Sequence, residues 1–564
     1  MASLSNAAAP PGRGEVTRCE RQCTWVTCSE EDAAASDEYG PLDIQVEVGE
    51  SPLFEHSSDA LFLPTEDVNI AKKSFNAWYN SGVLAALDTL AEHKVDGQVS
   101  WPSKMSVLLL GAARSFSALH SSFYPHLLMS GEELLAQFSG ASHWATCPVR
   151  AMEWHPHASR LAVARKDNLV QVYQMQTTAT SSCPHFSTGR MQQLKHPEQK
   201  RISSLAWKPY SGSVLAVGCQ TGVVVWQVRS HPGAPRPHPQ HLCSNGHSPV
   251  TSVAWSSDGR LLASASPADT SLMIWDVTSP DCTGTPITRH GGGGVSLLAW
   301  SSAISDTGMS RLLTATPSPL FRVWETRCFT CERWSNLAGR VTAACWSPDG
   351  NVLVFAMADD PALYYLTFFV SKTESADEST RRVGGADTAI KCVDLTPVEM
   401  AAANDMDEPV TVGGCVQSLA WDASGERLAA TFTADSPGRD LVAIFTTTSQ
   451  PVMEVLPCGF VRGRTGETPE VVTFQNDVES GALLSVAWSS GRIAFVPLLY
   501  NTPHSLDSAS TVDTLEKAQH SVSSIGTAFN SPVAPPLTAR QEALHKHGFG
   551  AAWPEQSPVP RTPW

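Results

Sequence analysis

One stretch of the chain decides its fold: GHSPVTSVAWSSDGRLLASASPADTSLMIWDV, residues 246–277. It contains an apolar run that ends in a large ring at Trp255, a turn at 256–259, a run of small residues, and a further apolar run that ends in a second ring at Trp275. Short apolar runs separated by turn residues are typical of buried β-strands. The stretch therefore predicts consecutive strands of one sheet.

The same two-ring pattern occurs seven times along the chain. The first rings are Trp154, Trp207, Trp255, Trp300, Trp346, Trp421 and Phe474, and the second rings are Tyr173, Trp226, Trp275, Trp324, Tyr365, Phe445 and Phe495. Within each pair the offset is 19, 19, 20, 24, 19, 24 and 21 residues. A four-stranded sheet cannot bury both of its faces alone, so repeated sheets must pack together and close into a ring.

Successive first rings are 53, 48, 45, 46, 75 and 53 residues apart, near or above the ~40 to 45 of WD-type blades. Only the interval of 75 requires an insertion. The predicted fold is all-β, a seven-bladed WD-type β-propeller over 145–500, with an N-terminal helical segment and a disordered C-terminal tail. Such a ring is first of all a binding platform.

The quoted stretch resembles a WD-repeat blade in its polar residues as well. In that family a histidine, a turn aspartate, a strand hydroxyl and an indole form a chain of hydrogen bonds, and buried polar groups of this kind must be satisfied as a network. The resemblance assigns these roles to His247, Asp269, Ser264 or Ser266, and Trp275. The other blades keep the rings and drop most of the polar set.

The N-terminal segment, residues 1–68, carries two strand-like pieces. One is 16–27, and the other alternates Ile44, Val46 and Val48 with polar residues. The seventh two-ring pattern supplies three strands, so we expect an N-terminal strand to complete the last blade and remove an exposed sheet edge. An independent N-terminal tail is the alternative.

Residues 69–140 are expected to be helical. Apolar residues fall on one face in 69–93 and in 102–123, and Ser130 with Glu133 forms a capping-box pattern ahead of a third helix. These helices are expected to pack on the propeller, or else to offer a face to a partner. The insertion at 371–412 is interpreted as a mobile acidic loop, and the tail at 501–564 as disordered.

Composition limits the function. The formal net charge of −16 argues against a nucleic-acid surface, and no run of apolar residues is long enough for a transmembrane helix. The N-terminus lacks a secretory signal, and the 14 cysteines are scattered, which favours reduced thiols in the cytosol or nucleus. Cys328 and Cys331 have no second pair to complete a metal site. Catalytic motifs are missing, so we expect no enzyme activity, no cofactor and no metal.

From about residue 70 to 500 the chain resembles a family of WD-repeat nucleoporins. The segments that carry this likeness are FSALHSSFYPHL at 116–127 and the stretches 154–157, 204–209, 261–267, 322–325, 331–334, 456–459 and 481–497. The likeness implies a non-catalytic scaffold of the nuclear pore complex, held at the nuclear envelope by other nucleoporins, including a membrane-embedded pore protein. It also implies support of protein cargo transport and a role at the mitotic spindle.

The tail bears on the kind of nucleoporin. It has one Phe-Gly dipeptide, Phe549-Gly550, whereas barrier-forming nucleoporins need many for weak multivalent binding. We therefore expect a scaffold component. The alternative is a WD-repeat adaptor of another assembly, such as a ubiquitin-ligase substrate receptor, because the fold alone does not separate the two.

Overall fold

A computed structural model describes most of the N-terminal segment and of the chain between 129 and 500. The described residues are 2–21, 24–35, 43–46, 90, 94–95, 98–99, 104–109, 129–176, 185–229, 237–278, 282–288, 293–302, 310–335, 337–368, 383, 385–386, 388–403, 408–449, 452–476, 478 and 481–500. The predicted tail and most of the predicted helices at 69–93 and 102–123 lie outside them. Within these ranges, no helix has the length and apolar character needed to span a membrane.

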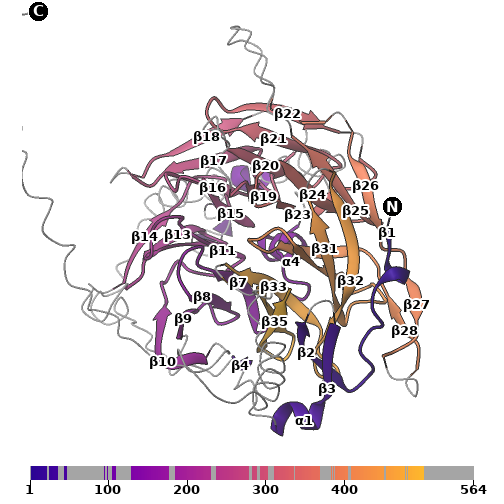
Figure 1. Cartoon of the computed structure of the whole chain (residues 1–564). Coiled ribbons are helices and arrows are strands. Elements are labelled where there is room, and N and C mark those ends of the chain that lie inside the picture. Colours follow the sequence, from indigo (N-terminus) through magenta and orange to yellow (C-terminus); the bar gives the residue numbers. More distant parts are fainter. Residues whose placement is uncertain are drawn as a thin grey trace, which may run out of the picture. The chain divides into compact units, whose positions relative to one another are not determined.

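Seven antiparallel sheets form a ring in the described part of the chain (Figure 1), which confirms the predicted seven-bladed propeller. In each blade the first strand lies innermost, and the inner strands contact one another around the whole ring. The strands of the first four blades are β7 (Val149–Trp154), β8 (Arg160–Arg165), β9 (Val170–Gln176), β10 (His185–Leu194); β11 (Ser204–Trp207), β12 (Val214–Cys219), β13 (Gly222–Gln227), β14 (His238–Leu242); β15 (Ser252–Trp255), β16 (Leu261–Ala265), β17 (Ser271–Asp276), β18 (Gly284–Thr288); β19 (Leu297–Trp300), β20 (Arg311–Ala315), β21 (Phe321–Glu325) and β22 (Thr330–Trp334).

The last three blades follow the same order. Their strands are β23 (Val341–Trp346), β24 (Val352–Met357), β25 (Asp360–Thr367), β26 (Ile390–Asp394); β29 (Val416–Trp421), β30 (Arg427–Phe432), β31 (Leu441–Thr448), β32 (Glu454–Arg462); β33 (Pro469–Gln475), β34 (Ala482–Trp488) and β35 (Arg492–Leu499). Apolar clusters fill the space between neighbouring sheets, and one cluster joins blade one to blade seven through Trp154, Leu161 and Phe495. The core is therefore circular.

Residues 2–46, which we call the N-terminal strap, run along the outside of blades five, six and seven. One strap strand pairs in parallel with β26 at the edge of blade five, and two others pair with β35 at the edge of blade seven. The fourth position of the last blade, which the sequence analysis assigned to an N-terminal strand, thus holds two of them. The strap elements are β1 (Ala2–Ser3), a 3-10 turn (Leu4–Asn6), β2 (Glu15–Arg21), β3 (Thr24–Ser29), α1 (Glu30–Ala35) and β4 (Asp43–Gln45).

The insertion between blades five and six departs from its prediction. The interpretation of 371–412 as one acidic loop is wrong for its second half, because β26 is the outer strand of blade five and β27 (Val398–Met400) pairs with β28 (Val410–Val412). The reason is apolar burial: Val393, Leu395 and Val412 are fully buried, in one cluster with Leu4 of the strap. The prediction rested on the acidic residues of the insertion and did not consider this alternating apolar pattern.

In five of the seven blades the register of the strands aligns the first ring and the second ring across the sheet. A leucine of the second strand lies between them, as where Trp255 pairs with Leu262 and Leu262 with Trp275. Blades five and seven differ: Trp346 is aligned through Leu353 with Leu366, one position beyond the expected ring at Tyr365. Successive residues of a strand face opposite sides of the sheet, so in blades five and seven the second ring faces the other side from the first. The seven ring pairs are therefore not equivalent, although the sequence pattern implied that they are.

Candidate docking site

The polar network predicted for blade three is assembled around Ser264. His247 lies with Nδ1 2.8 Å from Asp269 Oδ2 and Nε2 2.8 Å from Ser264 Oγ, and the Trp275 indole N–H donates to the same Oγ at 2.9 Å. Burial would raise the pKa of Asp269, but hydrogen bonds from His247 and from the backbone N–H of Ser271 outweigh it and lower that pKa. Ser266, the other predicted serine, is buried, and its hydroxyl has no hydrogen-bond partner among the described residues.

Two further blades carry parts of this network that the sequence analysis missed. In blade two the Trp226 indole donates to Gln199 Oε1 at 2.7 Å, and in blade four the Trp324 indole donates to Thr314 Oγ1 at 2.9 Å. Gln199 is eight residues before Trp207, as His247 is eight residues before Trp255. This matching offset could have identified Gln199 in the sequence as the counterpart of His247, because a side-chain amide can replace an imidazole in a hydrogen-bond network.

The inner-strand tryptophans bind neighbouring blades to one another. Several indole N–H groups donate across a blade boundary, and the one from Trp154 closes the ring between blades one and seven. These bonds are Trp154 to Ser485 Oγ (2.9 Å), Trp207 to the carbonyl of Glu153 (3.1 Å), Trp255 to that of Ala206 (3.0 Å) and Trp346 to that of Ala299 (2.9 Å). The predicted aromatic residues therefore hold the ring together by hydrogen bonds as well as by packing.

The inner strands all run in the same direction, so the ring has two distinct faces. We call the side where they begin the α4 face, and the side where they end, at the first rings, the open face. On the α4 face lies α4 (Gly131–Phe138), whose predicted capping box is present. Ser130 Oγ accepts from the Glu133 N–H at 3.3 Å, and the Glu133 carboxylate accepts from the Ser130 N–H at 2.7 Å.

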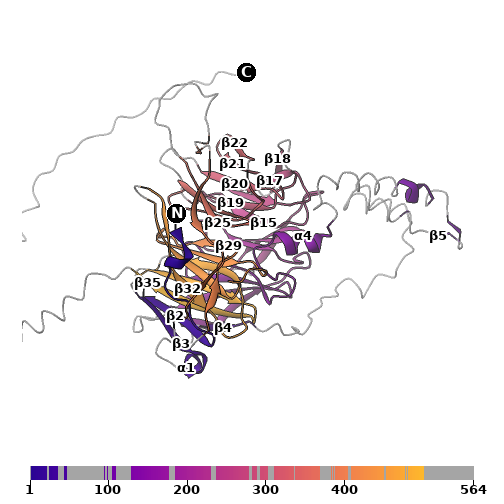
Figure 2. The same cartoon turned by 90° about the vertical axis from the view of Figure 1, so that its right-hand side faces the viewer.

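On the α4 face, helix α4 crosses the mouth of the central channel. It appears at the centre of the ring in Figure 1 and to one side of the sheets in Figure 2. Contacts from this helix reach blades on opposite sides of the ring: an ion pair from Glu132 to Arg201 (2.8 Å), the ring of Phe138 under the Arg340 guanidinium (5.1 Å), and the carbonyl of Ser139 accepting from Gln417 (3.4 Å). This mouth is therefore covered.

The opposite mouth opens into a funnel of about 650 Å³. Its lining comes from all seven blades and includes Glu153, Trp154, His157, Trp207, Tyr210, Trp255, Trp300, Trp346, Trp421, Asp422 and Asn476. At the outside, Tyr210 is 73% exposed and stacks on His157 with ring centroids 5.0 Å apart. Tyr210 also has a left-handed backbone, with φ of 56°, which is unfavourable for a bulky residue and is often associated with function.

Two carboxyl groups line the funnel, and they differ in their surroundings. Asp422 accepts hydrogen bonds from the Tyr500 hydroxyl at 2.6 Å and from the backbone N–H of Arg427 at 2.7 Å. Glu153 has no hydrogen-bond or ion-pair partner for its carboxyl group among the described residues. Burial raises the pKa of Glu153 to about 8, so its carboxyl group is mainly neutral at pH 7.

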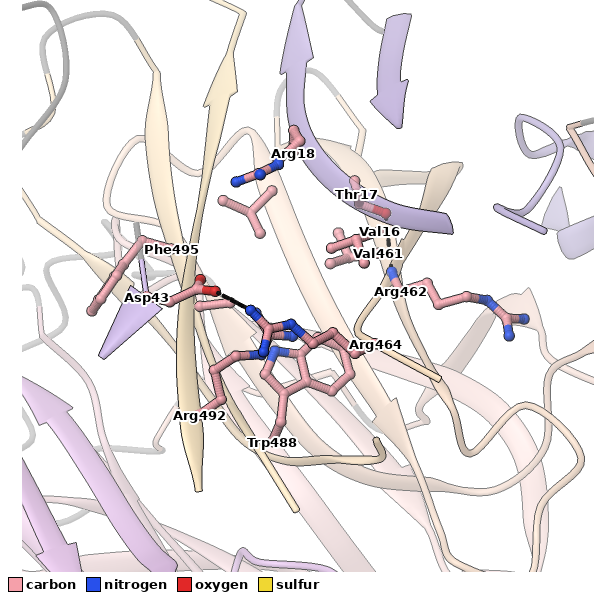
Figure 3. Close-up of a pocket in the computed structure, with 12 residues that line it drawn as sticks. Val16, Thr17, Arg18, Asp43, Val461, Arg462, Arg464, Trp488, Arg492 and Phe495 are labelled. Carbon is pink, nitrogen blue, oxygen red and sulfur yellow. Dashed lines mark hydrogen bonds and ion pairs between the residues drawn. The ribbon is translucent and has the colours of Figure 1, made fainter. Parts of the chain in front are cut away.

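The strap is fixed to blade seven at a small pocket (Figure 3). There Arg492 donates to Asp43 of the strap at 3.0 Å and to Glu467 Oε1 at 3.1 Å, and its guanidinium lies near the Trp488 ring. Burial would raise the pKa of Glu467, but its hydrogen bonds from Arg492 and Ser490 lower it. The pocket has room for about one water molecule, so it is a structural junction.

A second attachment joins the strap to blade six. Arg427 donates from Nη2 to Glu20 Oε1 at 2.7 Å and from Nε to Glu20 Oε2 at 3.2 Å, and both side chains are almost fully buried. Nearby, the Trp25 indole donates to the carbonyl of Cys458 at 3.4 Å. Among the described residues, no group of three histidine, cysteine or acidic side chains is arranged to hold a metal ion.

Comparison with known proteins gives one extended match and several partial ones. A family model described as the Aladin seven-bladed propeller matches residues 130–499. Aladin of Arabidopsis thaliana is 32% identical over 337 residues, which cover 55% of this chain and 68% of that protein. A chromatin assembly factor 1 subunit FAS2 homolog of Oryza sativa subsp. japonica is 27% identical over 130 residues, 23% of this chain and 25% of that protein.

Among solved structures, the Cps50 (Swd1) β-propeller domain of Myceliophteria thermophila aligns with 62% of this chain and 96% of that chain. The alignment has 16% identity and a TM-score of 0.43.

Proposed function

The chain belongs to the Aladin family of seven-bladed propellers, and from this we propose that it is a non-catalytic scaffold of the nuclear pore complex. It is a WD-type propeller, and in the proposed role it sits at the nuclear envelope and supports nucleocytoplasmic transport of proteins. Its proposed partners are other nucleoporins, including a membrane-embedded pore protein, and a further proposed role is at the mitotic spindle. No direct contact with nucleic acid is part of the proposal.

The observation that carries the proposal is a complete ring whose last blade is finished by the strap. Blade seven is completed by β2 and β4, and the buried Glu20–Arg427 pair fixes the strap to blade six as well. A ring closed in this way holds its faces in a fixed geometry before any partner arrives, which lowers the entropic cost of docking. Its two faces differ, since α4 covers one and the funnel opens on the other.

Imaging of the tagged protein in interphase cells tests the location. The tag belongs after Trp564, because Ala2 and Ser3 are paired with β26 and an N-terminal fusion would disturb blade five. We expect staining of the nuclear rim that persists after detergent extraction of soluble protein. Diffuse, extractable cytosolic staining would instead favour an adaptor of another assembly, such as a ubiquitin-ligase substrate receptor. Mitotic cells imaged in the same experiment test the spindle role.

A further inference from the structure

The funnel on the open face contains one side chain that its position in the fold does not explain. In each inner strand the residue before the first ring occupies the same position of the repeat, and in blades one, two and three it lines the funnel. In the seven blades this residue is Glu153, Ala206, Ala254, Ala299, Cys345, Ala420 and Thr473. Six blades therefore show that a small side chain suits this position, and blade one alone places a carboxyl group there.

The surroundings of Glu153 do not satisfy its charge. The neighbouring inner strand β11 contributes Leu205, Ala206 and Trp207 to the funnel, and the indole of Trp207 donates to the backbone carbonyl of Glu153, not to its carboxylate. Desolvation is the cause that raises the pKa of this group to about 8, with no compensating cation among the described residues. Glu153 keeps part of its surface exposed to the funnel, so a cationic ligand there can reach its unpartnered carboxyl group.

We propose that the funnel is a docking site for an arginine side chain of a protein partner, held by the Glu153 carboxylate in the wall and by the rings of Tyr210 and His157 at the rim. The volume of about 650 Å³ suits such a side chain and its flanking residues. Arginine is favoured over lysine because its planar guanidinium stacks on aromatic faces, pairs with a carboxylate in two-point geometry and is weakly hydrated.

The ligand can approach from one direction. Helix α4 covers the other mouth of the channel, so the guanidinium would enter past Tyr210 and reach Glu153 from the open face. The inference deepens the proposed docking function, on which it rests for the idea of a protein partner. Its test uses the purified full chain, so its failure is distinguishable from a failure to locate at the nuclear pore.

The test is calorimetric titration of the full chain with two blocked pentapeptides, Gly-Ser-Arg-Ser-Gly and the same peptide with citrulline in place of arginine. The two probes have nearly the same shape and differ in charge. Titration at pH 8.5, above the pKa of about 8 for Glu153, leaves most of the carboxyl group ionised. We expect the arginine peptide to bind the wild-type protein at least tenfold more tightly than the citrulline peptide.

The variants assign this preference to a residue. Glu153→Gln keeps the shape of the protonated side chain and is expected to abolish the difference between the peptides. Asp258→Asn, an exposed acid on the same face that does not line the funnel, is expected to retain it. Equal binding of the two peptides by wild type, a preference that survives Glu153→Gln, or its loss in Asp258→Asn would each overturn the proposal.

A surface variant keeps the test decisive if Glu153→Gln does not fold. Tyr210→Ala removes an exposed ring, so folding should be unaffected, and it is expected to weaken binding of the arginine peptide at least threefold. Unchanged binding by this variant would count against the proposal. No binding of either peptide by the wild-type chain would overturn it and leave the funnel to a segment of the same chain or a second copy.

Discussion

At the scale of single residues, Ser264 is the most exacting position in blade three. It is fully buried and satisfies both the Trp275 indole and the His247 imidazole. Ser264→Ala leaves the indole N–H of Trp275 and the Nε2 atom of His247 without a partner, at about 1–3 kcal/mol for each atom, while His247 Nδ1 keeps its bond to Asp269. We expect a clear fall in the free energy of unfolding, measured by chemical denaturation.

Ser266→Ala is the matched control for that experiment. Ser266 lies two residues after Ser264, directly after the end of β16. Its hydroxyl is equally buried, yet it has no hydrogen-bond partner among the described residues. We expect Ser266→Ala to lower the free energy of unfolding clearly less than Ser264→Ala does, because it leaves no hydrogen-bonding group without a partner. Equal effects of the two substitutions would contradict the network described here.

Glu153 makes stability depend on pH in an unusual direction. Burial raises its folded-state pKa from 4.5 to about 8, so between these values the unfolded chain loses the proton while the folded protein keeps it. Folding then binds a proton, and stability contributed by this group falls as pH rises through that window. In Glu153→Gln the group cannot titrate. The melting temperature of the variant should therefore rise relative to that of wild type between pH 4.5 and 8, and the difference should stay constant at higher pH. A constant difference across pH 4 to 9 would argue against the raised pKa.

At the scale of elements, β3 of the strap depends on a close approach at Gly459 in β32. A Cβ atom at this position would overlap the indole of Trp25, which donates to the neighbouring carbonyl of Cys458. Gly459→Ala should displace β3 and lower the free energy of unfolding by about 1–3 kcal/mol. Gly212→Ala is the control, because no atom lies within 4 Å of its Cβ position. Thermal melting of both variants checks this, and unchanged melting of Gly459→Ala would contradict the placement of Trp25.

Some elements of the fold can be predicted from the sequence, and others cannot. The seven inner strands were predictable because each has a ring at or next to its end after a short apolar run, and α4 because Ser130 and Glu133 signal its start. The pairing of β1 with β26 was not, since it joins residues almost 400 positions apart through two residue pairs, Ala2 with Val393 and Ser3 with Asp394. Local patterns carry no information about such a partner.

The same limit applied to the candidate site. The ring residues of the funnel were identified by periodicity, whereas the fold is needed to bring Tyr210 of blade two to Glu153 and His157 of blade one. Glu153 was visible in principle, as the one acid in a column of otherwise small residues. Recognising it required aligning the blades on their first rings and comparing the position before each ring.

At the scale of the whole molecule, the strap should govern cooperative stability. Deletion of residues 2–46 removes Leu4, Ile44 and Val46 from buried clusters, leaves the edge of β35 unpaired, and strands the Arg427 charge without Glu20. Breaking such a buried pair costs about 3–5 kcal/mol by itself. We expect a lower melting temperature and self-association through the open edge, measured by thermal melting and light scattering.

Deletion of residues 510–564 serves as the control, because the compact unit that contains the ring ends at Thr502. It should leave the melting curve nearly unchanged. If both deletions lowered the melting temperature equally, the stabilising role assigned to the strap would be wrong.

Contact between β2 and β35 also sets the timetable of biosynthesis. The ribosome releases Glu20 long before its neighbour Leu498, and at about 5–20 residues per second the interval is on the order of half a minute to a minute and a half. Until β35 is made, the nascent chain carries the strap strands β2 and β4 without their partner. The last blade is therefore completed late in synthesis, when β35 has been made and the residues after Tyr500 are still to be added, and until then the strap strands are exposed to non-native contacts.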